Sequence, residues 1–282
     1  MGKLDGEVAI ITGGTSGIGR RSVELFVAEG ATVVIAARRE VEGQRLAKEL
    51  GTRASFLRTD VTQEADVKAA VDHALSRFGR LDCIFNNARG PAPVGGIETI
   101  PVEQFDAAMA LLLRSVVLGM KHATPVMKRQ GSGSIINNGS IAGVRAGYSS
   151  SLIYGAAKAA VIHLTRCVAM ELGESGVRVN SISPGGIATG IFGKVAGLPA
   201  DAAERTIGAI KQAFERMQPM PRAGLPDDIA RAAVWLASDD SSFVNGHDLV
   251  VDGGLIGGRL WSVQQEALKQ LRSVVLSAGG EA

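Results

Sequence analysis

A serine, a tyrosine and a lysine in the middle of the chain have a spacing that could move a proton. Tyr154 and Lys158 are four residues apart in a segment with a helical pattern, so both side chains should lie on one helix face. Ser140 comes fourteen residues before the tyrosine, just after a strand-like run. A phenol has a pKa of about 10 and is a poor acid or base near neutrality, but an adjacent ammonium lowers that pKa. The three residues therefore predict a tyrosine acid–base with Ser140 hydrogen-bonding the substrate oxygen, although a Tyr–Lys pair alone is commonplace.

A glycine-rich turn lies near the N-terminus, between a strand-like run at 8–12 and a helical pattern at 17–28. Its sequence is Thr12-Gly13-Gly14-Thr15-Ser16-Gly17-Ile18-Gly19. In this position, backbone N–H groups and the helix dipole face a pyrophosphate, and glycines let it approach closely. The spacing G-x3-G-x-G differs from the G-x-G-x-x-G of other dinucleotide-binding turns, and no Gly-Lys-Ser/Thr of a P-loop follows. The context predicts nucleotide binding; a tight turn with a purely structural role is the alternative.

The residues after the second strand-like run bear on the choice of nucleotide. A carboxylate at this strand end would accept hydrogen bonds from the adenosine ribose and repel a 2′-phosphate. The chain instead has Ala37, followed by Arg38 and Arg39. A guanidinium pairs well with phosphate through its fork of donors. This favours NADP(H) over NAD(H); the alternative is a solvated loop with two exposed arginines. The positive nicotinamide of an oxidised cofactor would join Lys158 in lowering the tyrosine pKa.

The elements that must position these residues follow from an alternation of short apolar runs with longer helical patterns. Runs typical of strands lie at 8–12, 32–36, 54–58, 83–86, 134–138, 178–183 and 248–251. Helical patterns lie at 17–28, 41–50, 64–77, 102–129, 152–174 and 227–238. This alternation is typical of βαβ units, and almost continuously apolar strands are typical of sheets buried on both faces. We therefore expect an α/β fold with a doubly wound parallel sheet and helices on both faces.

The chain is expected to form a single domain, because no Pro/Gly/Ser-rich linker divides residues 1–258. Within it, the segment 189–225 is too long for a simple connection, and long irregular insertions are usually lids or binding loops. A surface excursion packed on the core is the alternative. Beyond the domain, the tail 259–282 has a helical apolar stripe that needs a surface to bury against. The stripe consists of Val263, Ala267, Leu271, Val274 and Val275.

Composition excludes several classes of function. The 30 basic and 28 acidic residues form no basic block, so neither a nucleic-acid nor a membrane-surface partner is expected. The four histidines and two cysteines form no zinc-site spacing and no disulfide framework, so no metal site is expected. Signal-peptide and myristoylation patterns are missing, and no apolar stretch reaches the roughly 18–20 residues of a membrane span. We expect a cytoplasmic protein whose chemistry depends on side chains or an organic cofactor.

With these motifs in order, the chain resembles the short-chain dehydrogenase/reductase family over about residues 4–254. The motifs that carry the resemblance are the 12–19 turn, Asp60-Val61, Asn86-Asn87-Ala88, Ser140, Tyr154-x3-Lys158, Asn180, Pro184-Gly185 and Asp252-Gly253-Gly254. The resemblance implies a Rossmann-type fold with about seven parallel strands and a nicotinamide cofactor. It also implies that the protein oxidises alcohols or reduces carbonyls.

The same resemblance implies a role for each matching residue. Tyr154 would donate or take the hydroxyl proton, Lys158 would lower its pKa and hold the nicotinamide ribose, and Ser140 would position the substrate oxygen. The implied cofactor contacts are Gly13, Thr15, Ser16, Gly17, Ile18, Gly19, Arg38, Arg39, Asp60, Val61, Asn86, Ala88, Lys158, Pro184, Gly185, Ile187 and Thr189. The expected substrate contacts are Ser140, Tyr148, Tyr154, Gly186, Ile191 and Phe192. We interpret Tyr148 as a pocket wall, and the apolar residues of the insertion as favouring a hydrophobic, cyclic substrate.

Two residues depart from the family pattern. Arg89 stands where glycine usually follows Asn-Asn-Ala, and Gly90 is the candidate to take over its backbone role. Leu112 stands where an asparagine usually holds a water on the proton path to the lysine. Leucine can hold no water, so Ser115, one turn on, is the candidate for another route.

These observations leave two functions open. The first is an NADP-dependent alcohol dehydrogenase or ketone reductase, which the intact Ser140, Tyr154 and Lys158 favour. The second is a non-catalytic nucleotide-binding relative, a sensor or interaction protein, which Leu112 and Arg89 favour.

The resemblance further implies that helices 102–129 and 152–174 pack against their copies in a partner. Apolar residues nearly encircle the first helix, and a helix that is apolar all round must be buried on more than one side. These residues are Met109, Leu111, Leu112, Leu113, Val116, Val117 and Leu118. We therefore expect a homodimer or homotetramer with two-fold symmetry.

Overall fold

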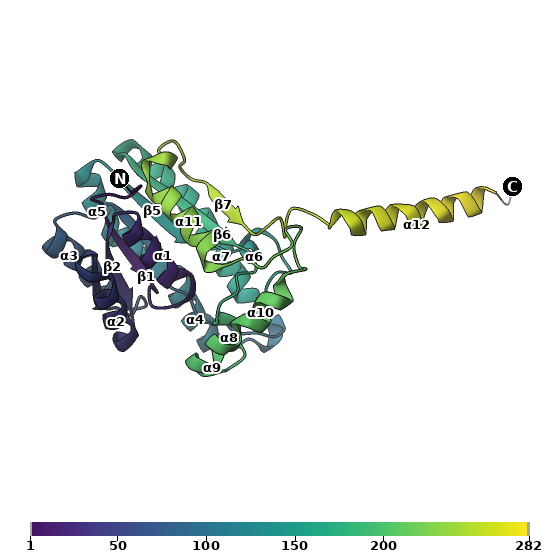
Figure 1. Cartoon of the computed structure of the whole chain (residues 1–282), viewed down its shortest axis with the longest axis horizontal. Helices are drawn as coiled ribbons and strands as arrows, with labels where there is room; N and C mark the ends of the chain where they lie inside the picture. The colour runs from purple at the N-terminus through teal and green to yellow at the C-terminus, as the bar shows by residue number, and fades with distance from the viewer. Residues whose placement is uncertain (1, 281–282) are drawn as a thin grey trace.

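Seven parallel strands form one sheet in the computed structural model, which describes residues 2–280 (Figure 1). The strands are β1 (Val8–Thr12), β2 (Thr32–Ala37), β3 (Ala54–Arg58), β4 (Cys83–Asn86), β5 (Gly133–Asn138), β6 (Val177–Pro184) and β7 (Asp248–Val251). Their order across the sheet is β3-β2-β1-β4-β5-β6-β7. The prediction of an α/β fold with about seven parallel strands is confirmed, and each predicted strand-like run is a strand whose ends shift by one residue at most.

Helices cover both faces of this sheet, as the doubly wound pattern predicts. One face carries α1 (Gly17–Ala28), α2 (Glu40–Leu50) and α11 (Pro226–Ala237), and the other carries α3 (Glu64–Phe78), α5 (Ser115–Gln130) and α7 (Leu152–Leu172). Successive side chains of a strand point to opposite faces. In β1, Ala9 and Ile11 therefore join the first hydrophobic cluster, and Val8 and Ile10 join the second. Because both clusters are buried, every residue of β1 is buried, which explains its continuous apolar run.

The strand order reverses between β1 and β4, and this reversal positions the site. β1 pairs with β2 on one side and with β4 on the other. In open α/β sheets, ligands bind beyond the carboxyl ends of the strands at such a switch point. The glycine turn follows β1, Asn87 follows β4, and Ser140 lies just beyond β5. All three therefore meet at one edge of the sheet.

The segment 102–129 is not the single helix that the sequence predicts. It forms α4 (Val102–Met109), a π-helical turn at Ala110–Arg114, and α5. The π-turn changes which side chains face inward, so Leu112, Val116 and Leu118 are buried within the chain and Val117 is exposed. Most of the apolar residues that nearly encircle this segment thus find partners in the same chain. π-turns inside α-helices are frequent at functional sites.

The segment Leu152–Ser175, which contains α7, has the length and apolar composition of a membrane span, with a mean hydropathy of 1.2. The expectation that no stretch reaches this length overlooked it. In the structure, 39% of its most apolar 18-residue stretch is buried, and Val161, Ala169 and Leu172 pack in the cluster beneath the sheet. The core of the fold accounts for the apolar face of this helix.

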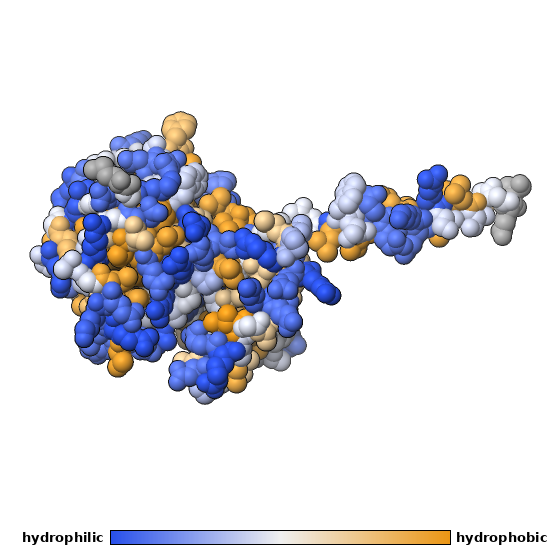
Figure 2. All heavy atoms as spheres, viewed as in Figure 1, coloured by the Kyte–Doolittle hydropathy of each residue, from blue (hydrophilic) through white to orange (hydrophobic). Residues whose placement is uncertain are grey.

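The insertion between β6 and α11 contains α8 (Ile191–Val195), α9 (Ala200–Arg205) and α10 (Ile207–Phe214). Figure 1 shows these short helices together at the lower edge of the body. The chain then returns through β7 to α12 (Trp261–Gly279), which projects away from the body (Figure 1). No residue of α12 is buried, and its apolar side chains appear as orange patches in Figure 2. The stripe predicted for the tail is therefore uncovered within residues 2–280.

Candidate active site

Two adjoining cavities lie at the carboxyl ends of the strands. The turn cavity, about 300 Å³, is lined by the glycine turn and by residues that follow β2, β3 and β4. The tyrosine cavity, about 690 Å³, is lined by Ser140, Tyr154 and side chains of the insertion. Four residues line both cavities: Arg89, Gly90, Pro91 and Ile191. A ligand in each cavity would meet the other at this shared boundary.

The start of α7 sets the position of Tyr154. Ser151 caps the helix, because its Oγ accepts a hydrogen bond from Tyr154 N at 3.1 Å and donates one to Pro93 O at 2.5 Å. One turn later, Lys158 is fully buried, and its Nζ donates to Asn138 O at 2.6 Å. This Nζ lies 5.8 Å from the centroid of the tyrosine ring. The spacing of four thus brings a buried ammonium beneath the phenol, as the sequence predicts.

Ser140 reaches the same place from the neighbouring strand. It is the N-cap of α6 (Ile141–Val144), and its Oγ accepts a hydrogen bond from Ala142 N at 3.2 Å. The capped turn fixes a buried hydroxyl at the wall of the tyrosine cavity. Close packing of α6 on α7 keeps the two elements in register, since a Cβ on Gly143 would lie 2.5 Å from the Lys158 backbone.

The electrostatics of the site favour the phenolate of Tyr154. Burial alone raises its pKa, but the charges of Lys158 and Arg89 and hydrogen bonds from Ser140 and Arg89 outweigh burial, so the pKa lies below its ordinary value. Burial also lowers the pKa of Lys158, which the Tyr154 charge partly restores. A lowered phenol pKa suits a group that must give and take a proton near neutrality.

Leu112 packs against the turn of α7 that carries Tyr154. It is fully buried in the π-turn and shares a small apolar cluster with Ile153 and Ala157, against which Tyr154 also packs. Ser115, the candidate for another proton route, donates its hydroxyl hydrogen to Leu111 O at 2.6 Å. The leucine therefore contributes packing to the site and no polar group.

The glycine turn forms a cradle that side chains would fill. Gly13 and Gly17 have φ of +68° and +52°, in the region that favours glycine. A Cβ on Gly19 would lie 2.3 Å from Gly13 O. The hydroxyl of Thr12 closes the turn onto β4 by accepting hydrogen bonds from the backbone N of Asn87 and Ala88, both at 2.9 Å. The turn is thus too tightly folded for a side chain at Gly19, it is attached to the sheet through Thr12, and its outer face lines the turn cavity.

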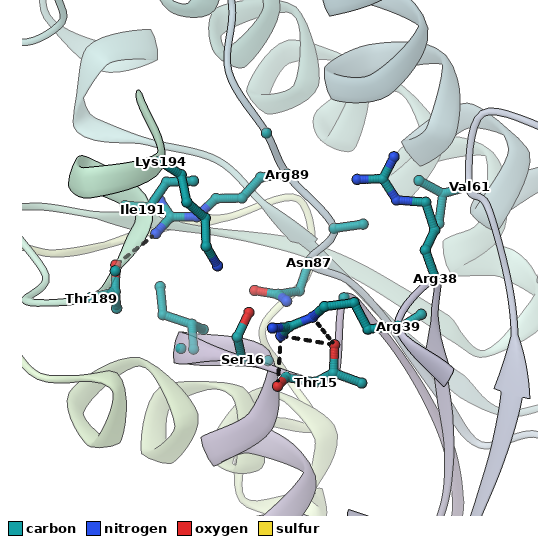
Figure 3. Close-up of a pocket in the computed structure, with 18 of the residues that line it drawn as sticks. Thr15, Ser16, Arg38, Arg39, Val61, Asn87, Arg89, Thr189, Ile191 and Lys194 are labelled. Carbon is teal, nitrogen blue, oxygen red and sulfur yellow. Dashed lines mark hydrogen bonds between the residues drawn. The ribbon is translucent and has the colours of Figure 1, made fainter. Parts of the chain in front are cut away.

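The two arginines after β2 have different surroundings (Figure 3). Arg39 is tied to the turn: its Nη2 donates to Thr15 O at 2.8 Å and to Thr15 Oγ1 at 3.1 Å. Arg38 is exposed, and within residues 2–280 its side chain makes no hydrogen bond. Burial by itself raises the pKa of Asp60. Hydrogen bonds from Thr62 and the charges of Arg38 and Arg58 outweigh burial, so the pKa lies below its ordinary value. Arg38 is therefore available to a ligand, and Arg39 shapes the turn.

The other predicted cofactor contacts are divided between the cavities. Those that line the turn cavity are Gly13, Thr15, Ser16, Gly17, Ile18, Gly19, Arg38, Arg39, Asp60, Val61, Ala88 and Thr189. Pro184 and Gly185 line the tyrosine cavity. Ile187, which forms a β-bridge with Gly224, and the buried Lys158 line neither cavity. Asn86 points into the core, where its amide donates to Asn137 Oδ1 at 2.9 Å, and it is Asn87 that lines the turn cavity.

All six predicted substrate contacts line the tyrosine cavity: Ser140, Tyr148, Tyr154, Gly186, Ile191 and Phe192. Tyr148 donates its hydroxyl to Leu255 O at 3.3 Å, as a wall residue can. Phe192 packs edge-on against Phe214 of α10, with ring centroids 5.0 Å apart. Among residues 2–280, no group of three or more His, Cys, Asp or Glu side chains could hold a metal ion.

Sequence reasoning did not place three charged side chains in the site. Lys194 and Glu204 of the insertion line the turn cavity, and Arg89 lines both cavities. The apolar stripe of α10 indicates that Phe214 faces inward. Lys194 and Glu204 lie in α8 and α9, and these helices are too short to show a periodic pattern that would indicate which way a charged side chain faces.

Comparison with known proteins finds oxidoreductases that match nearly the whole chain. The family model described as Enoyl-(Acyl carrier protein) reductase matches residues 13–256. The chain is 43% identical to momilactone A synthase of Oryza sativa subsp. japonica, over 90% of this chain and 91% of that protein. It is 40% identical to 3-alpha-(or 20-beta)-hydroxysteroid dehydrogenase of Mycobacterium tuberculosis, over 91% and 92%. The solved structure of levodione reductase has a TM-score of 0.81 and 32% identity, and the match covers 91% of this chain and all of that one.

Proposed function

Because the chain belongs to the short-chain dehydrogenase/reductase family, we propose that it transfers a hydride between NADP(H) and a secondary alcohol or ketone. Its relatives are oxidoreductases, which supports the reaction class. The observation that carries the proposal is the position of Tyr154 and Ser140 in the wall of the tyrosine cavity, which adjoins the turn cavity, with the buried Lys158 beneath the phenol.

The turn cavity fits a nicotinamide dinucleotide. Side chains at Gly13, Gly17 and Gly19 would crowd neighbouring atoms, so the backbone of the turn stays accessible to a ligand. Its N–H groups lie at the start of α1, where a diphosphate is favoured. Asp60 and Val61 would hold the adenine end, and Thr189 the nicotinamide end. A bound dinucleotide would donate the hydride in reduction and accept it in oxidation.

The residues of the tyrosine cavity then handle the proton. In reduction, the phenol of Tyr154 donates its proton to the carbonyl oxygen, and in oxidation its phenolate takes the proton of the substrate hydroxyl. Ser140 donates a hydrogen bond to the same oxygen and so holds it against the tyrosine. Lys158 keeps the phenolate accessible through its charge. This division of work gives Ser140, Tyr154 and Lys158 one function each.

The shape and lining of the tyrosine cavity favour an apolar, cyclic substrate. Phe192, Phe214 and Met217 form one side of it, and Val195 and Leu255 add to its apolar lining. Two similar proteins, a hydroxysteroid dehydrogenase and levodione reductase, are also named for ring compounds.

The proposal is tested by mixing the purified protein with NADPH and a panel of cyclic ketones and following NADPH absorbance. Turnover of any ketone supports the enzyme. If NADPH binds and no carbonyl is reduced, and no cyclic alcohol is oxidised with NADP⁺, the non-catalytic nucleotide-binding relative becomes the better interpretation.

Arg38→Ala is expected to raise the KM for NADPH about tenfold or more and to leave the KM for NADH unchanged. The reason is the loss of a charge-assisted contact to the 2′-phosphate, worth roughly 1.5–3 kcal/mol. Steady-state kinetics with both cofactors measure the effect. Arg39→Ala is the matched control: since Arg39 holds Thr15, its loss should weaken both cofactors alike. A wild type that prefers NADH would contradict the assignment.

We further propose that the protein is a homodimer or homotetramer. Apolar side chains remain exposed on the two helices that the resemblance assigns to subunit packing: Val102 and Phe105 on α4, and Leu152 and Met170 on α7. Burying them against a second copy would remove this surface from water. Light scattering at micromolar concentration should give two or four times the 29.3 kDa of one chain. A monomer would count against the proposal.

A further inference from the structure

The boundary between the two cavities contains a cation whose only part in the proposed hydride transfer is to help lower the pKa of Tyr154. Arg89 follows β4 at the position where the family usually has glycine, and its half-buried side chain lines both cavities. Figure 3 shows it reaching across toward Thr189. Its Nη2 donates to Thr189 Oγ1 at 3.2 Å. The guanidinium therefore lies inside the reaction site and does not extend into bulk solvent.

Arg89 has no acidic partner. Within residues 2–280, no carboxylate lies within ion-pairing distance of it, and every other residue that lines the tyrosine cavity is uncharged. A guanidinium has five N–H donors, and neutral hydroxyls satisfy only a few of them. Holding a cation in a half-buried site without a counter-charge is unfavourable. The buried ammonium of Lys158 nearby increases the positive charge of the site.

We propose that Arg89 binds a carboxylate of the substrate, next to the carbonyl or hydroxyl that reacts. The planar fork of arginine fits a carboxylate with two parallel hydrogen bonds. Arg89 and Tyr154 line the same cavity, and the charge of Arg89 contributes to the lowered pKa of the phenol, so a carboxylate on Arg89 would lie beside the oxygen that faces Tyr154. The apolar remainder of the cavity takes a ring or alkyl body. The substrate class is thus an apolar 2-oxo acid or the corresponding 2-hydroxy acid.

This inference rests on the proposed function, and a matched pair of probes tests it. Benzoylformate and its methyl ester share the ring and the ketone and differ in the charge of the carboxyl group. The wild type should prefer the acid, and Arg89→Met should lower the acid-to-ester ratio of kcat/KM by roughly 10- to 100-fold. Arg89→Lys keeps the charge but loses the two parallel N–H donors, so its acid-to-ester ratio should lie between those of the wild type and Arg89→Met. The ratio isolates the carboxylate, because any effect of Arg89 on the Tyr154 pKa acts on both probes alike.

Two further measurements separate the possible failures. The Kd for NADPH, from a fluorescence titration, should be unchanged in Arg89→Met. If this Kd rises and the acid-to-ester ratio does not change, Arg89 serves the diphosphate of the cofactor and the proposal is wrong. An unchanged Kd with an unchanged ratio also overturns it. If no ketone is reduced at all, the proposed function fails. Calorimetric binding of benzoate to the wild type, and none to Arg89→Met, would then still support the carboxylate site.

Discussion

Replacing Tyr154 by phenylalanine is expected to lower kcat about 10²- to 10⁴-fold, the usual size of general acid–base catalysis. The substitution removes one oxygen atom and keeps the ring that packs against Leu112 and Ile153, so the fold and both cavities should persist. With no phenol, the reacting oxygen loses its proton donor in reduction and its acceptor in oxidation. Steady-state kinetics in both directions measure the loss.

Tyr148→Phe is the matched control for this experiment. Tyr148 is the only other tyrosine of the chain, it lines the same cavity, and its hydroxyl donates to a backbone carbonyl of Leu255. Losing that bond should change KM more than kcat. The Kd for NADPH should be the same in both variants and the wild type. Near-normal turnover in Tyr154→Phe, or a large loss of kcat in Tyr148→Phe, would reverse the assignment of the two tyrosines.

The parts of the site that follow from sequence are those whose spacing reflects one regular element. Tyr154 and Lys158 share a face because α7 is a regular helix, and Ser140 reaches them because parallel strands end at one edge of the sheet. The buried ammonium beneath the phenol is a direct consequence of the spacing of four.

Other parts of the site depend on contacts between distant segments, which a periodic pattern in the sequence cannot predict. The π-turn at Ala110–Arg114 interrupts an unbroken helical pattern, and the inward position of Leu112 follows from that turn. The side chain of Asn86 is engaged by Asn137 of the next strand, which gives the cavity position to Asn87. The direction of Arg89 depends on Thr189, one hundred residues later in the chain. Such contacts depend on which strands become neighbours, and local sequence does not carry that information.

Replacing Lys158 by methionine is expected to lower the rate of alcohol oxidation near neutral pH by about 10²-fold and to move its pH profile upward. The phenolate is the base in oxidation, so the rate rises with pH through the pKa of Tyr154. Lys158 lowers that pKa, and without its charge the burial of the phenol would raise it. Each unit of upward shift costs about tenfold in phenolate at a fixed pH below the pKa.

The pH dependence separates this electrostatic role from a merely structural one. Loss of Lys158 also leaves Asn138 O without the hydrogen bond from Nζ, so some stability should be lost. Misfolding would lower the rate equally at every pH, whereas loss of the charge is expected to leave a rate that recovers as the pH is raised. Lys158→Arg keeps the charge and should retain a profile closer to that of the wild type. If the midpoint of the pH–rate profile is unchanged in Lys158→Met, another cation stabilises the phenolate. Arg89, whose charge also lowers the pKa of Tyr154, is the candidate.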